Sequence, residues 1–484
     1  MDYGVVIKVL GILLVFEGLL MIPALFVSFF YGQGDSFAFL LSIALTAIIG
    51  LFMFRVKGYH KKIKAKEALA IVAIGWILTS FFGSLPFVIS GSIPSFVDAF
   101  FETISGLTTT GATLIEDVEA LPKGILFWRS FTHWIGGMGI LVLTVAILPT
   151  MGIGGFQIFK AEIPGPMADK IVPRIKDTAK ILYVTYISMT ILQIGLLLIG
   201  GMNLYESTIH TFGTLGTGGF SVRRENIGAY DSSYIHIVIN IFMVLSGINF
   251  SLFYALYKGK WRDVIRNEEL RLYLTIIFIS SILVGLNIFI ASGGYKNIGL
   301  AFKDSFFQVS SIMTTTAYTT TDFDLWPVFS KTILFMLMFI GGCAGSTSGS
   351  IKGLRILVLF KLVKRQIGKT FHPNAYIPVK VDGKILNDST ITSIASFFIL
   401  YIIIFFIGTL VISLEGLDFQ SSISTAAASI GNVGLGFGSV GPSQNFSGFS
   451  SWAKMFLSLL MLMGRLELFT IIALISPKSW KNDI

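Results

Sequence analysis

The sequence predicts an all-α integral membrane protein in which one helical unit occurs four times. Three observations indicate this fold class: an apolar composition, a series of long hydrophobic runs, and a glycine- and threonine-rich string that recurs about every 100 residues. Of the 484 residues, 54% are hydrophobic and 13% are charged, which is more apolar surface than a soluble fold can bury.

Ten hydrophobic runs are long enough to cross the ~30 Å hydrocarbon core of a bilayer as helices. They cover roughly residues 5–30, 36–54, 67–90, 126–149, 180–200, 234–257, 271–291, 331–360, 391–413 and 453–475. The first run carries Lys8 and Glu17 and lacks a small-residue cleavage site, so we interpret it as a retained span and not a signal peptide.

Lysine and arginine are concentrated in every second connecting segment. With a cytoplasmic N-terminus, the segments 55–66, 150–180, 258–271, 352–384 and 476–484 lie inside and hold 26 of the 36 basic residues. This positive-inside pattern predicts a multi-pass protein of the cytoplasmic (inner) membrane with both termini in the cytoplasm. The net charge of +9 therefore reflects topology and does not indicate a nucleic-acid partner. The outward segments are comparatively acidic and would attract cations.

Four similar strings follow the runs that end near residues 90, 200, 291 and 413: "TTTGAT", "GTGGFS", "TTTAYT" and "NVGLGF". Aligned on Gly111, Gly219, Ala317 and Gly434, they are separated by 108, 98 and 117 residues, which indicates a fourfold internal repeat. Thirteen residues before these positions lie Asp98, Glu206, Asp304 and Ser421, which are residue types that suit the start of a helix.

We therefore interpret each repeat as a span, a short pore helix, an extended turn and a second span. An N-terminal two-helix unit covers residues 1–57, and the pore repeats cover 58–157, 158–262, 263–380 and 381–484. The second helix of the third repeat is predicted to be broken.

The turns predict a site for a dehydrated cation. Their unpaired backbone groups cannot face lipid, so they must line water. Four such turns around one axis would form a ring of carbonyl and hydroxyl oxygens at the negative ends of four helix dipoles, which can replace the hydration shell of a cation. The candidate ligands are Thr109, Thr110, Gly111, Thr217, Gly218, Gly219, Thr315, Thr316, Ala317, Asn432, Val433 and Gly434. The alternative is close helix packing at small residues, but the shared offset in four strings favours the cation site.

A possible gate lies in the eighth run, which is interrupted by "GGCAGSTSGS" at residues 341–350. Ten consecutive residues of this kind disfavour a continuous helix. The functional interpretation is a loop below the turns that blocks the passage, and the alternative is a close-packed helix crossing. The candidate gating residues in the loop are Gly341, Gly342, Gly345, Ser346, Thr347 and Gly349.

Arg465 lies near the middle of the last run. A charged side chain at that depth in a bilayer costs free energy, so Arg465 is a candidate functional residue. Glu467 follows two residues later and would point to nearly the opposite side of a helix, so it does not simply neutralise the charge of Arg465. We expect Arg465 to project toward the 341–350 loop as an electrostatic barrier to cations. A structural ion pair with a carboxylate on another span is the alternative.

Several long strings resemble the pore-forming membrane subunit of the Trk/Ktr potassium-uptake systems of prokaryotes, on the Trk branch. They are "FETISGLTTTGATL", "FWRSFTHWIGGMGILVLTVAILP", "AEIPGPMADKIVPRI", "IGGCAGSTSGSIKGLRI" and "MGRLELFT". The resemblance implies potassium uptake through four repeats, with the 341–350 loop as the intramembrane gate. It also implies a homodimer that carries a cytosolic ring of nucleotide-binding regulatory subunits.

The chain departs from this family at Ala317, where a filter glycine is usual. A methyl group costs about 1–2 kcal/mol in a left-handed conformation. We therefore expect the third turn to be splayed or to contribute fewer carbonyls, with softer selectivity for potassium over sodium.

Other functions are less well supported by the sequence. A sodium- or proton-coupled secondary transporter is the main alternative, but such folds show inverted repeats. No catalytic motif or cofactor site beyond the potassium site is found, and the single cysteine, Cys343, allows no disulfide within the chain. His133 and His210 are expected to serve packing or hydrogen bonding. The basic inner segments, especially 352–384, are candidate docking surfaces for an acidic cytosolic partner or contacts to anionic lipid, and the sequence does not separate these two.

Overall fold

The computed structural model describes residues 1–56, 63–139, 175–291, 295 and 297–475. The sequence predictions for residues 140–149, for most of the segment 150–180 and for the last nine residues lie outside this part of the chain. The described residues are mostly helical, and six helical stretches are long and apolar enough to cross a membrane, or seven if one bent pair counts as a span. The other predicted spans fall on shorter helices or reach into the undescribed residues. The six stretches are Tyr3–Tyr31, Ser36–Phe54, Ala65–Ile89, Lys180–Ile199, Glu268–Ala291 and Asp388–Glu415.

The N-terminal unit consists of α1 (Tyr3–Leu20), α2 (Ile22–Tyr31) and α3 (Ser36–Phe54). Asp2 caps α1, where its carboxylate accepts the backbone N–H of Gly4 at 3.0 Å. The helices α1 and α3 cross closely at two glycines: a Cβ on Gly11 would lie 2.6 Å from the carbonyl oxygen of Gly50. Such an approach is open only to small residues, so this pair fixes the crossing point.

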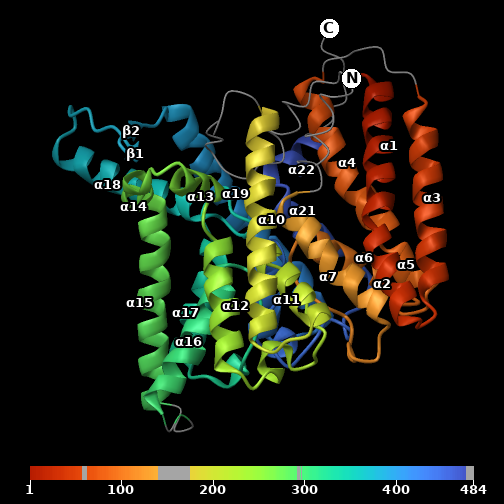
Figure 1. The fold of residues 1–484 in the computed structure, drawn as a ribbon. Helices are drawn as coiled ribbons and strands as arrows, with labels where there is room; N and C mark the ends of the chain where they lie inside the picture. Colours follow the sequence, from red (N-terminus) through yellow and green to blue (C-terminus); the bar gives the residue numbers. More distant parts are fainter. Residues whose placement is uncertain (57–62, 140–174, 292–294, 296, 476–484) are drawn as a thin grey trace.

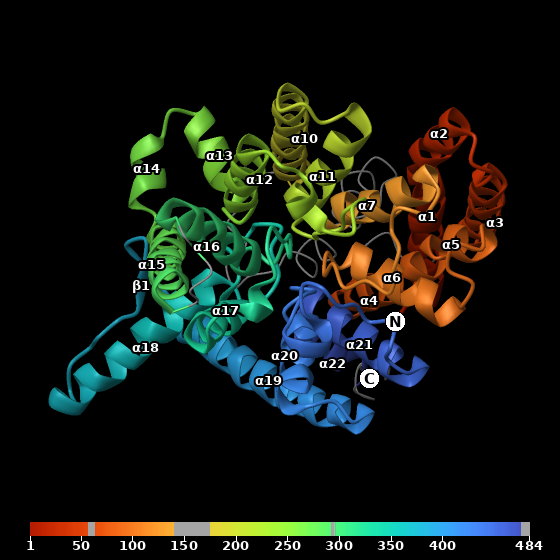
Figure 2. The same ribbon diagram turned by 90° about the horizontal axis from the view of Figure 1, so that it is seen from below.

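Four helical units follow the N-terminal unit and surround a common centre (Figure 2). Each contains a long first helix, a short helix and a second helix. The units are α4 (Ala65–Gly83), α5 (Leu85–Ile89), α6 (Phe96–Leu107) and α7 (Lys123–Gly137); α10 (Ile175–Ile199), α11 (Leu204–Gly216) and α12 (Ser233–Ser246); α15 (Glu268–Ala291), α16 (Ile298–Met313) and α17 (Val328–Ile340); and α19 (Asp388–Ile412), α20 (Phe419–Ile430) and α21 (Ser451–Arg465).

The short helices begin earlier than the sequence pattern predicted. The capping side chains are Ser95, Asn203 and Asp418, three residues before the predicted positions, and they accept the N–H groups of Asp98, Glu206 and Ser421. Asp98 and Glu206 are therefore first-turn acids, which the helix dipole stabilises. The prediction for Asp304 is wrong. This residue lies inside α16, which is capped at Asn297, and its carboxylate accepts the hydroxyl of Tyr295 at 3.1 Å.

The second helices are interrupted at more places than the sequence analysis expected. The predicted run 234–257 is not one helix, because α12 ends at Ser246 and is followed, after a bend of 95°, by α13 (Phe250–Tyr257). The run 453–475 is likewise divided into α21 and α22 (Leu468–Ile475). Gly247 stands at the first break, and the second falls at Leu466 and Glu467, where Glu467 is left-handed with a φ of 60°. Gly247 and Gly464, which lies in the last turn of α21, each lie against another segment that a side chain would displace.

One end of the molecule carries the basic elements that the charge pattern places in the cytoplasm. Here lie α13, α14 (Trp261–Arg266), α18 (Gly353–Phe371) and a hairpin of β1 (Lys380–Val381) and β2 (Lys384–Ile385). The strands are antiparallel, with Lys380 opposite Ile385. The start of α1 lies at the same end, and the helix α16 lies toward the other end (Figure 1).

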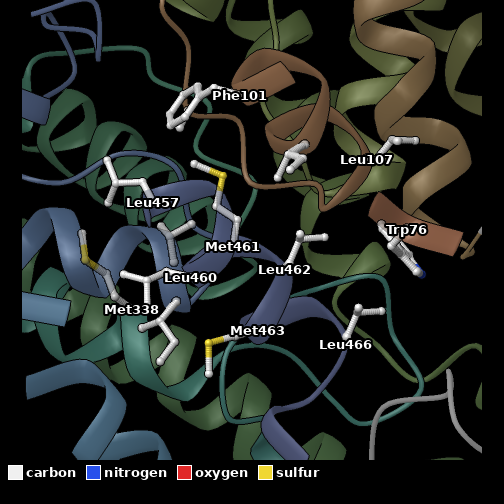
Figure 3. Close-up of a cluster of buried hydrophobic side chains, with 14 of the residues drawn as sticks. Trp76, Phe101, Leu107, Met338, Leu457, Leu460, Met461, Leu462, Met463 and Leu466 are labelled. Atoms are coloured by element: carbon white, nitrogen blue, oxygen red, sulfur yellow. The ribbon is translucent and has the colours of Figure 1, made fainter. Parts of the chain in front are cut away.

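The core around the second helix of the fourth unit joins three of the units. Figure 3 shows side chains of α21 beside residues from α4, α6 and α17. The buried cluster includes Leu457, Leu460, Met461, Leu462, Met463 and Leu466 with Trp76, Phe101, Leu107 and Met338. This packing holds the C-terminal end of α6, at Leu107, against α21.

Candidate functional site

The four turns after the short helices share one unusual backbone conformation. In each, the residue two before the aligned position is left-handed: φ is 55° at Thr109, 55° at Thr217, 59° at Thr315 and 51° at Asn432. A left-handed β-branched residue is a genuine outlier, because its branched side chain crowds the backbone. Its occurrence at the same place in three turns, with asparagine in the fourth, marks a site where the surroundings impose the strain.

The same turns are closed by equivalent hydrogen bonds. One backbone N–H in each turn donates to the carbonyl five residues earlier, at 2.8 Å in all four cases. The donors are Thr110, Gly218, Thr316 and Val433, and the acceptors are Ser105, Gly213, Ser311 and Ala428. The four predicted strings therefore have one common geometry.

At three junctions, the main chain of one turn lies against the main chain of the next. A Cβ on Gly111 would lie 2.0 Å from the carbonyl oxygen of Gly218, and a Cβ on Gly219 would lie 2.0 Å from that of Thr316. A Cβ on Gly434 would lie 2.0 Å from the carbonyl oxygen of Thr110. The order of neighbours is thus fourth, first, second, third. The structure brings the predicted residues of all four strings together.

Ala317 does not splay the third turn, so this expectation is wrong. Its φ is 61°, in the same left-handed region as Gly219 at 79° and Gly434 at 86°. The carbonyl of Thr316 also lies against Gly219 at the distance found in the other two junctions. The packed neighbours impose the conformation that the methyl group disfavours.

Polar side chains at the turns are used unequally. The hydroxyl of Thr110 lies 2.7 Å from that of Thr108 and accepts the side-chain amide of Asn432 at 3.0 Å. The hydroxyl of Thr316 makes the same contact to Thr314, at 2.7 Å. By contrast, the Thr109 hydroxyl and the side-chain carbonyl of Asn432 are buried without a hydrogen-bond partner among the described residues. Buried polar oxygens usually have a partner, so these two are free to contact an ion or a water molecule.

The predicted break in the eighth run is confirmed, because α17 ends at Ile340 and α18 begins only at Gly353. The loop between them contacts the turns directly. The N–H of Gly349 donates to the Thr315 hydroxyl at 2.7 Å, and the Ser350 hydroxyl donates to the carbonyl of Gly431 at 3.0 Å. The loop therefore lies directly against the third and fourth turns.

The loop glycines are packed closely. A Cβ on Gly341 would lie 2.5 Å from the carbonyl oxygen of Gly349. One on Gly342 would lie 2.5 Å from the Ser348 hydroxyl, and one on Gly349 would lie 2.4 Å from the carbonyl oxygen of Gly431. On Gly345 it would lie 2.9 Å from Asn249. The Ser346 hydroxyl donates within the loop to the carbonyl of Cys343 at 2.6 Å.

Arg465, at the end of α21, reaches this loop. Its guanidinium donates to the carbonyl of Thr347 at 2.8 Å, and also to the carbonyls of Gly136 and, at 3.1 Å, Gly137 at the end of α7. Glu467 forms an ion pair with Arg355 of α18, at 2.5 Å. A second cation, the Lys352 ammonium, donates to the carbonyl of Ser348, so two neighbouring loop carbonyls are bonded to side-chain cations.

The comparison with known proteins decides the family. The chain matches the TrkH family, described as a cation transport protein, over residues 36–482. It is 37% identical over the full length of both chains to the Trk system potassium uptake protein TrkH of Escherichia coli, and 30% identical to TrkI of Halomonas elongata, covering 99% of this chain and 97% of that one. The crystal structure of the potassium transporter TrkH from Vibrio parahaemolyticus aligns with a TM-score of 0.88 and 35% identity, over 99% of this chain and 100% of that chain.

The chain belongs to the TrkH family of cation transport proteins. The resemblance found in the sequence is thereby confirmed, and the protein is a membrane transporter of the Trk potassium uptake family and not an enzyme. Among the described residues, no three histidine, cysteine, aspartate or glutamate side chains form a metal-binding group.

The sequence analysis did not predict a buried ion pair that lies behind the first turn of this TrkH-family chain. Arg129 on α7 and Glu102 on α6 are 2.7 Å apart, and both are nearly inaccessible to solvent. Glu102 also accepts the Thr113 hydroxyl and the Leu114 N–H, each at 2.9 Å, while Arg129 donates to the carbonyl of Ser221 at 3.2 Å. The pair thus ties the first turn to the second unit. The available signal was a charge inside the apolar string "FWRSF".

His133 and His210 make the packing and hydrogen-bond contacts that the sequence analysis expected of them. His133 lies 2.8 Å from the carbonyl of Gly106, and its ring contacts Phe220 at a centroid distance of 4.0 Å. His210 lies 2.9 Å from the hydroxyl of Tyr230. Both are buried beside the turns, where they support the backbone.

Proposed function

We propose that this chain takes up potassium across the cytoplasmic membrane, with the four turns acting as its selectivity filter. The observation that carries the proposal is the set of four left-handed turns, whose main chains approach one another closely at Gly111, Gly219 and Gly434. Backbone carbonyls around one axis replace the water of a dehydrated potassium ion. The short helices end at the turns, so the negative ends of their dipoles favour a cation there.

The proposed ligands are the predicted filter residues. The carbonyls at the junctions belong to Thr110, Gly218 and Thr316, with Val433 at the equivalent position. The unpartnered side-chain oxygens of Thr109 and Asn432 are further candidates. Potassium is the only ion or cofactor that the proposal requires on this chain.

The proposed topology has ten crossings and both termini in the cytoplasm. The basic segments support this orientation, because α18 and the β-hairpin lie at the same end as the start of α1 (Figure 1). We retain the division into an N-terminal unit and four pore repeats as part of this proposal.

The loop 341–352 and Arg465 form the proposed gate. The loop lies against the third and fourth turns, and the guanidinium adds a positive charge at its Thr347 carbonyl. A positive charge on the conduction path repels potassium until it moves away.

The proposed partners are a second copy of the chain and a cytosolic nucleotide-binding regulatory subunit. One side of α18 exposes Phe360, Val363, Ile367 and Phe371, at helical spacing. An apolar stripe of this length is typical of a surface that another chain covers. Cross-linking in native membranes would test the homodimer, and a monomer in the bilayer would contradict it.

Uptake of rubidium-86 into vesicles of the purified protein tests the proposed function. We expect uptake without an imposed proton gradient, inhibition by potassium, and weak inhibition by sodium. Uptake that requires a sodium or proton gradient would instead indicate a coupled secondary transporter.

A further inference from the structure

A buried carboxylate joins the two ends of the gate loop. Glu269, in the first turn of α15, is 5% exposed. Its Oε1 atom accepts the N–H of Ala344 at 2.6 Å and the N–H of Leu354 at 2.8 Å. Ala344 lies near the beginning of the loop and Leu354 just after its end. One oxygen atom therefore fixes the separation of the two ends.

The residues next to Glu269 are bonded to the cytosolic β-hairpin. Asp382, at the exposed tip of the hairpin, accepts the side-chain amide of Asn267 and the N–H of Glu268, both at 2.8 Å. The Glu268 carboxylate in turn forms an ion pair with Lys361 of α18. The start of α15 is thus held between the hairpin and the loop.

A separate apolar cluster connects the same parts. It contains Ala344 and Leu354, whose N–H groups bind Glu269, together with Val379, Val381 and Leu386 of the hairpin segment. Packing of this density transmits small displacements between neighbours because the interior leaves few voids. The polar contacts and the apolar contacts therefore link the hairpin to the loop independently.

We propose that Glu269 is a positioning residue that clamps the gate loop, and that the cytosolic hairpin controls this clamp through Asp382. The inference rests on the proposed role of the loop as the gate. A cytosolic partner that displaces the hairpin would pull on Asn267 and Glu268, move the Glu269 carboxylate, and release the ends of the loop. The hairpin is exposed on the face where such a partner would bind.

The chain contains a reporter for this movement. Cys343 is the only cysteine, it is buried, and it directly precedes Ala344 in the loop. The rate at which its thiol reacts with N-ethylmaleimide measures opening of the loop without any engineered label. This readout does not depend on ion flux, so it separates failure of the clamp from failure of the proposed transport function.

The test compares reaction rates of Cys343 in the full-length protein in vesicles. Glu269→Ala removes the acceptor for both N–H groups and is expected to raise the rate about tenfold or more. Glu269→Asp keeps the charge but shortens the reach, and it should also raise the rate. Glu269→Gln keeps an acceptor oxygen and should stay within about threefold of the wild type. Asp263→Asn, an exposed carboxylate of the same corner, is the matched control.

The role of the hairpin is tested with Asp382→Ala. Asp382 is exposed, and the substitution leaves the sequence of the gate loop unchanged. We expect a faster reaction, and a double variant with Glu269→Ala that is no faster than Glu269→Ala alone, because both act on one contact path. Folded Glu269→Ala and Glu269→Asp proteins with the wild-type rate would overturn the clamp. A wild-type rate in Asp382→Ala, or additive effects, would overturn the control by the hairpin.

Discussion

The side-chain amide of Asn432 donates to the hydroxyl of Thr110 across a distance of 3.0 Å and thereby joins the fourth turn to the first. The same amide donates to the carbonyl of Met461 on α21 at 2.8 Å. Asparagine stands here at the position that threonine occupies in the other three turns. It forms a bridge that a threonine side chain is too short to make.

Asn432→Ala should weaken selectivity more than it weakens folding. The variant loses both donated hydrogen bonds, each contributing about 0.5–1.5 kcal/mol, and frees the Thr110 hydroxyl on one side. We expect sodium to inhibit rubidium-86 uptake more strongly than in the wild type. Equal sodium inhibition in a folded variant would contradict a role of this bridge in selectivity.

Ala317 and Gly434 form a matched pair at equivalent positions. Ala317→Gly should leave the potassium-to-sodium ratio close to that of the wild type, because the third turn already has the left-handed geometry. Gly434→Ala should abolish uptake, because the new methyl group would lie 2.0 Å from the Thr110 carbonyl oxygen. Ion uptake and detergent-solubilised yield are measured for both. A higher potassium-to-sodium ratio in Ala317→Gly than in the wild type would show instead that the methyl group lowers selectivity.

Arg465→Ala should raise rubidium uptake in the absence of a partner. It removes the positive charge and the 2.8 Å hydrogen bond to the Thr347 carbonyl. Hydrogen bonds to charged groups contribute about 1.5–3 kcal/mol, so an increase of about tenfold or more is expected. A low folded yield with unchanged uptake per molecule would indicate a structural role instead.

Glu102→Ala should destabilise the protein strongly. It leaves Arg129 as a buried charge without its carboxylate, a change that costs about 3–5 kcal/mol. The apparent melting temperature in detergent should fall. The pair Arg365–Asp388, whose carboxylate is exposed, offers a control in which Asp388→Ala has little effect. Equal melting temperatures for the two variants would show that the buried pair is not a stabilising element.

Local sequence patterns predicted the features that depend on local chemistry. The offset shared by four strings located the four turns, and ten consecutive small residues located the break between α17 and α18. Both signals work because runs of glycine and other small or β-branched residues disfavour a continuous helix and so mark where a helix ends.

The remaining features depend on distant neighbours. The breaks that end α12 and α21 were missed because the groups packed against Gly247 and Gly464, the Tyr273 hydroxyl and the Ile430 carbonyl, come from distant segments that no local pattern reveals. The splayed turn expected at Ala317 was wrong for the same reason, since packing outweighs the preference of one methyl group. Asp304 was misplaced because α16 starts before the position that the other repeats suggest.

The contact of glycine with carbonyl at the junctions of the turns has a further consequence. Since main chain meets main chain at Gly111, Gly219 and Gly434, the spacing of the turns at these three junctions does not vary with the volume of a side chain. Relatives that prefer a different ion would have to change the number or orientation of the oxygen atoms at the turns, and not the width of the opening between them. Divergence in this family should therefore appear at the hydroxyl- and amide-bearing positions, while the size of the opening remains constant.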